Sequence, residues 1–277
     1  MKNITLCLLV ILGWSASSFA QDSEKIKGDR NLTIKQTYVD EFKKIIIGED
    51  FKVELFYNKK PSVEIETDDN LHEYINIAVV DGVLTLASTG DIRPRKLEVK
   101  INYGDMFSDI EVKDDAEVRS LTSLELNNAM LKTSGSSRAY LNIKTDSFNF
   151  VSTEKSKVKL NITATDVVTQ ISDNTKMDAL INASTAKIDL YQRANADIEG
   201  TINTLTLRGD NNSQFNGKNF TAKTCEVIAE FASDVYIEAT ESISIAASGS
   251  SEVYLYGNPQ ITITKFTDTV KLQKKEK

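Results

Sequence analysis

The sequence predicts an all-β protein whose chain winds into a parallel β-solenoid, right-handed and β-helix-like, with about eight coils of roughly 19 residues and an N-terminal β-rich cap. The first observation behind this prediction is a repeat: Ser134-Gly135-Ser136-Ser137 recurs as Ser248-Gly249-Ser250-Ser251, and weaker copies fill the interval. Ser137 and Ser251 lie 114 residues apart, which is six intervals of 19. A fixed period of this length is typical of a solenoid, in which each repeat stacks on its neighbours.

The second observation is that the copies can be aligned. Each copy has a small or polar anchor residue two positions before a hydrophobic one, and successive anchors are 17 to 21 residues apart. Turns of variable length produce such a drift when the strands keep their register. The anchors are Ala116, Ser137, Ser156, Thr175, Ala196, Ser213, Ser233 and Ser251. The repeats are therefore predicted to occupy residues 114–259.

The third observation is an alternation of apolar and polar residues within each copy, as in Ala139-Tyr140-Leu141-Asn142-Ile143. A period of two is typical of a half-buried strand. Each copy holds two such runs, so one coil is expected to have two strands and two turns. The turn segments, such as Asp173-Asn174 and residues 209–212, contain Gly, Asn and Asp, which tolerate a positive φ.

Residues 42–113 are expected to form the β block that caps the solenoid and makes one domain with residues 114–259. Asp81-Gly82 between two apolar runs is a strong hairpin signal, and residues 71–74 are predicted to form a single helical turn. Such a cap protects an edge that would otherwise pair with another chain. The expected strands of this block are 42–47, 51–57, 63–67, 75–80, 83–87 and 97–101.

Residues 260–277 are predicted to form a C-terminal strand and a charged tail. Apolar residues in this segment are expected to close the last coil, as the β block closes the first. End-to-end self-association of two copies through their outermost coils is a further prediction. The closing residues are Ile261, Ile263, Phe266, Val270 and Leu272.

Residues 1–20 have the features of a cleaved signal peptide. Lys2 precedes an apolar stretch from Ile4 to Leu12, and Ser18-Phe19-Ala20 matches the small-residue cleavage pattern. The apolar stretch is too short to span a bilayer as a helix, so no transmembrane segment is predicted. Residues 21–41 are expected to be a linker. The protein is therefore predicted to be exported to the periplasm, the cell surface or the extracellular space.

Charge and cysteine content limit the partners and the chemistry. The chain has a formal net charge of −7, which becomes −8 when Lys2 is removed with the signal. Because phosphate affinity comes from clustered Lys and Arg, no nucleic-acid partner is predicted. Cys225 is the single cysteine that remains after the signal, and its alternating neighbours predict a buried structural thiol.

The sequence predicts no catalytic residues, metal site or cofactor. His72 is the single histidine, and a solvated surface role fits it better than a catalytic triad. Polysaccharide hydrolases need two carboxylates that flank the scissile bond, but the candidates are expected to be scattered on solvated faces. These candidates are Asp178, Asp189 and Asp197, with Arg193 as a substrate clamp. Asp114-Asp115 and Asp210-Asn211-Asn212 offer oxygen ligands for Ca²⁺, but without the glycine-rich acidic repeat of calcium solenoids.

Four tyrosines are the candidate binding residues. Trp14 leaves with the signal, so the mature chain has no tryptophan on which a sugar ring would stack. Tyr140, Tyr236 and Tyr254 each follow the anchored hydrophobic position of their coil and should face outward, and Tyr256 follows on the same strand. Tyr236 and Tyr254 belong to neighbouring coils, where they are expected to stack as a pair. Plain cross-strand packing explains the same residues without a ligand.

The chain resembles a known family on the residues that open and close the repeats. They are Leu97-Glu98-Val99-Lys100-Ile101, Asp115-Ala116-Glu117-Val118 and the closing segment from Ser248 to Pro259. Together they resemble the putative auto-transporter adhesin, head GIN domain family, over about residues 42–259. The resemblance implies a β-solenoid domain exported by Gram-negative bacteria, with an adhesive role and no catalytic residues to carry over.

These observations favour an exported, non-catalytic, adhesin-like binding module. Its outer sheet faces and rows of turns would contact a protein or glycan on a surface. One alternative is a periplasmic envelope protein with a structural or sensing role. A second alternative is a β-helix enzyme that acts on polysaccharides.

Overall fold

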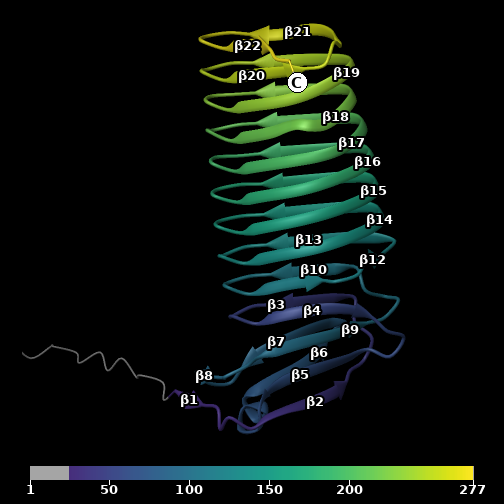
Figure 1. The fold of residues 1–277 in the computed structure, drawn as a ribbon, viewed down its shortest axis with the longest axis vertical. Coiled ribbons are helices and arrows are strands. Elements are labelled where there is room, and N and C mark those ends of the chain that lie inside the picture. Colours follow the sequence, from purple (N-terminus) through teal and green to yellow (C-terminus); the bar gives the residue numbers. More distant parts are fainter. Residues whose placement is uncertain (1–24, 277) are drawn as a thin grey trace, which may run out of the picture.

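The computed structural model describes residues 25–276 and confirms the predicted fold (Figure 1). Strands make up 67% of the described residues, and stacked parallel coils form a β-solenoid of about nine turns. The signal peptide predicted at residues 1–20 lies outside the described residues. Within the described part of the chain, no helix is long and apolar enough to cross a membrane.

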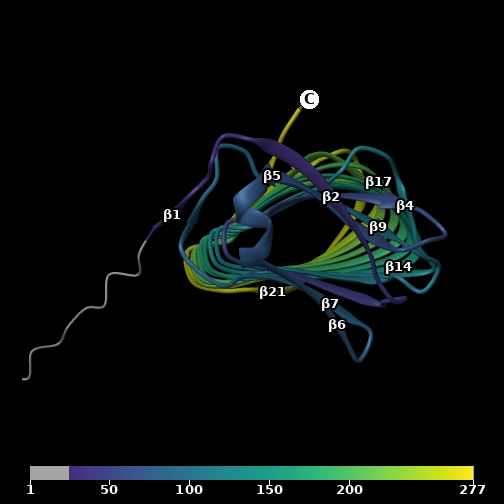
Figure 2. The same ribbon diagram turned by 90° about the horizontal axis from the view of Figure 1, so that it is seen from below.

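The regular coils are built from long strands that bend once. The first halves of the strands pair with one another in one sheet, here called the first face. The second halves pair in another sheet, the second face. In β14, for example, the first half pairs with β11 and the second half with β13. Viewed along the axis, the coils superpose into a flattened ring (Figure 2). The strands are β14 (Arg138–Ser152), β15 (Lys157–Ile171), β16 (Lys176–Leu190), β17 (Asn195–Gly209), β18 (Gln214–Ala229) and β19 (Asp234–Ala247).

The core lies between the two faces and follows from the alternation in sequence. In β15, for example, Val158, Leu160 and Ile162 are buried and the residues between them are exposed. The register corrects one anchor of the repeat, because Met177 pairs with Ala196, which makes Ala196 a hydrophobic core position. The buried Ala194 is the true anchor. With this correction the four steps from Ser137 to Ser213 are all 19 residues.

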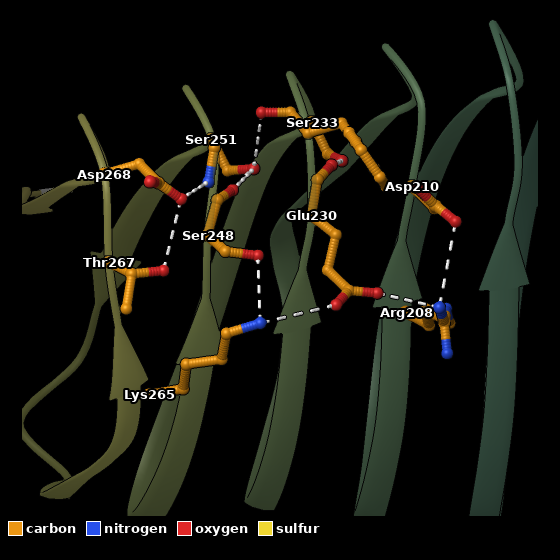
Figure 3. Close-up of polar contacts among 11 residues, drawn as sticks. Arg208, Asp210, Glu230, Ser233, Ser248, Ser251, Lys265, Thr267 and Asp268 are labelled. Atoms are coloured by element: carbon orange, nitrogen blue, oxygen red, sulfur yellow. Dashed lines mark hydrogen bonds and ion pairs between the residues drawn. The ribbon is translucent and has the colours of Figure 1, made fainter.

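One turn of every coil contains a residue in the left-handed conformation. Glycine, asparagine and aspartate were expected there, but Glu154, Gln192 and Phe231 also have φ near +60°. A carboxylate one coil further along offsets part of this strain at several turns. The N–H of Glu154 donates to Asp173 Oδ2 at 3.1 Å, and the N–H of Gly249 donates to Asp268 Oδ2 at 2.9 Å. Figure 3 shows this edge of the stack near Asp268.

The N-terminal part extends both faces and then covers the end of the stack. On the first face β4 pairs with β11 and is followed by β9, β5 and β2, while on the second face β3 pairs with β10 and is followed by β7 and β6. The stacked coils therefore begin within the segment 42–113 that was expected to be the cap. The 3₁₀ helix η2 (Asp69–Tyr74) lies across this end and contains the predicted helical turn (Figure 2).

The strands of this part match the six that were predicted and add others. Residues 21–41, expected to be a linker, include β2, which pairs antiparallel with β5. The strands that precede β14 are β1 (Ile26–Lys27), β2 (Leu32–Tyr38), β3 (Lys44–Ile47), β4 (Lys52–Tyr57), β5 (Ser62–Asp68), β6 (Ile75–Val80), β7 (Val83–Ser88), β8 (Ile92–Arg93), β9 (Glu98–Tyr103), β10 (Asp109–Val112), β11 (Glu117–Ser120), β12 (Leu124–Glu125) and β13 (Asn128–Thr133).

The C-terminal end differs from the closure that was predicted. β20 (Glu252–Tyr256), β21 (Gln260–Phe266) and β22 (Lys271–Lys274) continue the two faces, so the expected closing residues belong to the last coil itself. Ile261, Ile263 and Phe266 are 45%, 51% and 43% exposed, because no further strand of the described chain covers them. The solenoid therefore has one covered end and one open end.

Candidate functional site

A shallow trough crosses the outer surface of the first face. It has a volume of about 540 Å³ and spans strands β14 to β17. The floor of the trough is formed by Leu141, Leu160 and Ala179, whose side chains face the core. Its outward-facing lining consists mainly of Tyr140, Asn142, Lys159, Asn161, Asp178, Leu180, Asp197 and Glu199.

The strand register assembles the trough from two columns of side chains. Tyr140, Lys159, Asp178 and Asp197 are partners in successive strands. The second column is two residues further along each strand. Asn142, Asn161, Leu180 and Glu199 form it. Neighbouring parallel strands are about 4.8 Å apart, so each column presents its groups at that spacing.

The two aspartates of the trough correct an expectation from the sequence. Asp178 and Asp197 are not scattered, because they face each other across β16 and β17. Lys159 Nζ lies 3.6 Å from Asp178 Oδ2, and Asn216 Nδ2 donates to Asp197 Oδ1 at 2.7 Å. The other candidates lie elsewhere: Asp189 pairs with a lysine on the second face. Arg193 donates to Asn174 in a turn.

A column of cationic side chains runs beside the trough, between it and the row of turns. Arg138 pairs in register with Lys157, which pairs with Lys176. All three side chains are exposed. Arg138 Nη1 lies 3.9 Å from Glu117 Oε2, while Arg119 binds the same carboxylate and stacks on the Tyr140 ring at 5.0 Å.

The predicted tyrosine pair is present near the C-terminal end of the first face. The Tyr236 and Tyr254 rings are stacked, with centroids 4.3 Å apart and an interplanar angle of 12°. Lys275 Nζ lies over the Tyr254 ring, 5.0 Å from its centroid. The Tyr254 hydroxyl donates to Glu252, and this bond raises the Tyr254 pKa. The Tyr254 ring and hydroxyl therefore contact Tyr236, Lys275 and Glu252 within the chain. Tyr256 lies on the same strand, in register with Glu238.

Comparison with known proteins places the chain in a family. The family model for the putative auto-transporter adhesin, head GIN domain, matches residues 41–180 and 161–259. The chain belongs to this family. No protein among the curated sequences matches it.

Solved structures share the fold of this head GIN domain. A putative adhesin from Parabacteroides distasonis ATCC 8503 is 18% identical, with a TM-score of 0.67 over 90% of this chain and all of that one. A putative adhesin from Parabacteroides merdae ATCC 43184 is 16% identical, with a TM-score of 0.63 over 91% of this chain and all of that one. A putative lipid binding protein from Parabacteroides distasonis is 15% identical, with a TM-score of 0.58 and the same coverage.

The Ser-Gly-Ser-Ser turns of the head GIN domain lie at the edge of the stack. Ser137 and Ser251 are buried anchors, and Ser251 Oγ donates to the Ser248 carbonyl at 2.9 Å (Figure 3). Gly135 and Gly249 take the left-handed conformation. The two turns that were predicted to be structural consist of Ser134, Gly135, Ser136, Ser137, Ser248, Gly249, Ser250 and Ser251.

An ion-pair network occupies the second face near these turns. Arg208 Nη2 lies 2.7 Å from Glu230 Oε2 and 3.7 Å from Asp210 Oδ2, and Lys265 Nζ lies 3.8 Å from Glu230 Oε1 (Figure 3). Asp210, one of the residues considered for calcium, is therefore paired with a cation of the chain. Within residues 25–276, no group of three or more His, Cys, Asp and Glu side chains is placed to hold a metal ion.

The single histidine and the buried cysteine both lie away from the trough. His72 on η2 is 3.0 Å from Thr33 Oγ1, and partial burial together with the Lys35 charge lowers its pKa. Cys225 is buried in β18, and this burial raises its thiol pKa to about 12. A thiol with such a pKa is almost entirely protonated at neutral pH, so it is a poor nucleophile.

Proposed function

We propose that this head GIN domain is an exported, adhesin-like binding module that contacts a surface partner with the outer surface of its first face. The observation that carries the proposal is the trough across β14 to β17. Its side chains point away from the core, and Asn161 and Leu180 on its wall are exposed. They are therefore available to a partner without any change in the fold.

The solenoid suits this role because it fixes the positions of the binding groups. Outward side chains stand on paired strands, so the spacing between columns is set by backbone hydrogen bonds rather than by flexible loops. A preorganised surface loses little conformational entropy when a partner binds. Amide and carboxylate groups along the trough can exchange hydrogen bonds with a polar ligand, and Leu180 adds an exposed apolar contact.

The polar lining favours a protein or a glycan over an acyl chain. One structure that shares the fold is described as that of a lipid binding protein. A site for an acyl chain is expected to be concave and mostly apolar. The trough instead carries Lys159, Asp178, Asp197 and Glu199. Tyr236, Tyr254 and Tyr256 are proposed as accessory contacts on the same face.

The proposal is tested with the purified protein on an array of glycans and matrix proteins. Asn161→Trp fills the trough, and Asn149→Trp places the same side chain at an exposed outward position on the second face. Saturable binding that the first variant weakens and the second leaves intact is expected. Equal binding by both variants, or no saturable partner on the array, would contradict a role for this surface.

A further inference from the structure

We infer that the first face holds a site for an anionic polysaccharide, whose acidic groups lie against the cationic column Arg138, Lys157 and Lys176. The inference rests on the proposed function and names the class of partner for that surface. The acidic groups are carboxylates, sulfates or phosphates carried on a sugar chain. The glycan lies along the solenoid axis, with its acidic groups on the column and its hydroxyl groups over the trough.

The cationic side chains of the column repel one another. Its members are direct cross-strand partners, so like charges face each other at one strand spacing, about 4.8 Å. Like charges directly opposite each other destabilise a sheet. None of the ion pairs in residues 25–276 involves Lys157 or Lys176, and Arg138 shares a single carboxylate with Arg119. An anionic ligand would relieve this repulsion.

The cationic charge is local. The whole chain has a formal net charge of −7, so it repels polyanions at long range. The cations of the column gather on β14, β15 and β16 at the margin of the trough, while Lys159 within the trough is paired with Asp178. In the same column, β17 and β18 carry the neutral Asn195 and Gln214. The next two strands carry Asp234 and Glu252. This change of sign marks where the site ends.

Groups that can bind sugar hydroxyls stand directly beside the cations. Tyr140 and Asn142 lie two and four residues after Arg138 on β14, and Asn161 is the partner of Asn142 on β15. All three side chains line the trough. Amide groups donate and accept hydrogen bonds, which suits sugar hydroxyls. Nucleic acid is the less favoured polyanion, because the column lacks a row of exposed aromatic faces on which bases would stack. On the Tyr140 ring, Arg119 already lies over one face.

The test compares polygalacturonate with uncharged dextran of similar length, by calorimetry at low and high NaCl. The full mature chain is expected to bind polygalacturonate, to bind it more weakly at high salt and to ignore dextran. Lys157→Glu combined with Lys176→Glu should weaken binding by about tenfold or more, since two attractive charges become repulsive. Lys218→Glu with Lys223→Glu on β18 makes the same change in net charge and should alter affinity by less than about twofold.

Several results would overturn the inference. They are no polygalacturonate binding at low salt, equal losses in the two double variants, or equally tight binding of a single-stranded DNA oligonucleotide. Circular dichroism of each variant checks that the solenoid is intact. If an array partner is lost in Asn161→Trp but retained in the Lys157→Glu, Lys176→Glu variant, the anionic site is refuted and the proposed function stands. If both variants keep the array partner, the proposed function is refuted as well.

Discussion

Gly200 in β17 is the position where one added methyl group is expected to disturb the stack of coils most. Its φ is +115°, a conformation that residues with a Cβ rarely adopt. A Cβ added there would stand 2.1 Å from the carbonyl oxygen of Ile181 and 2.9 Å from its carbonyl carbon. Because the contact is with the backbone of β16, a side-chain rotation cannot relieve it.

The expected magnitude follows from the strain and the lost pairing. Gly200→Ala places a residue in a disfavoured backbone region, which costs about 1–3 kcal/mol. Moving β17 away from β16 weakens ladder hydrogen bonds that each contribute about 1 kcal/mol. The free energy of unfolding should therefore fall by about 3 kcal/mol or more.

Gly209→Ala is the matched control in the same strand. Its backbone is not left-handed, and an added Cβ would meet Ser213 Oγ at 3.2 Å and Ser233 Cβ at 3.3 Å, both on side chains. Its free energy of unfolding should change by about 1 kcal/mol or less. Urea unfolding followed by far-UV circular dichroism measures both variants. A Gly200→Ala protein as stable as the wild type, or equal losses in both variants, would show that the close contact with Ile181 does not limit the residue at position 200.

Four further predictions concern single sites. Phe231→Gly should raise the free energy of unfolding by about 0.5–1 kcal/mol, since Phe231 has φ of +60° and is 61% exposed; a lower urea midpoint would contradict this. Cys225 should react with a thiol reagent only after unfolding, because burial raises its pKa to about 12; fast reaction of the native protein would argue against that burial. Partial burial and the Lys35 charge lower the His72 pKa, so its NMR resonances should titrate below 6.5 in the native protein and move up in urea; a native midpoint above 6.5 would be inconsistent with this. End-to-end self-association at high concentration is expected through the open last coil, and Ile263→Lys should remove it in sedimentation velocity; a wild type that stays monomeric would count against it.

The solenoid could be predicted from the sequence because both of its periods are visible there. Period-two alternation marks the strands, and the 19-residue step marks the coils. The anchor at Ala196 was wrong because alanine occurs at both residues 194 and 196, and only the pairing of Met177 with Ala196 decides between them. Left-handed Phe231 could not be predicted, since the coil geometry imposes that conformation against the residue's own preference.

The trough was harder to predict because its members share no residue type. Tyr140, Lys159, Asp178 and Asp197 become one column only when the strands are in register. A signal for this was nevertheless present, since all four residues are spaced 19 apart in sequence. The same spacing relates the cationic residues of β14, β15 and β16. Listing outward residues by repeat position, rather than by chemical type, would have shown both columns.

A surface adhesin has to meet its partner outside the cell, and accessibility to a protease added to intact cells is the decisive measurement. Intact cells that produce the full chain are treated with a protease, with lysed cells as the control, and the chain is then detected. We expect the domain to be digested on intact cells, so that the undigested chain is no longer detected. Digestion only after lysis would contradict a surface adhesin and support the periplasmic alternative.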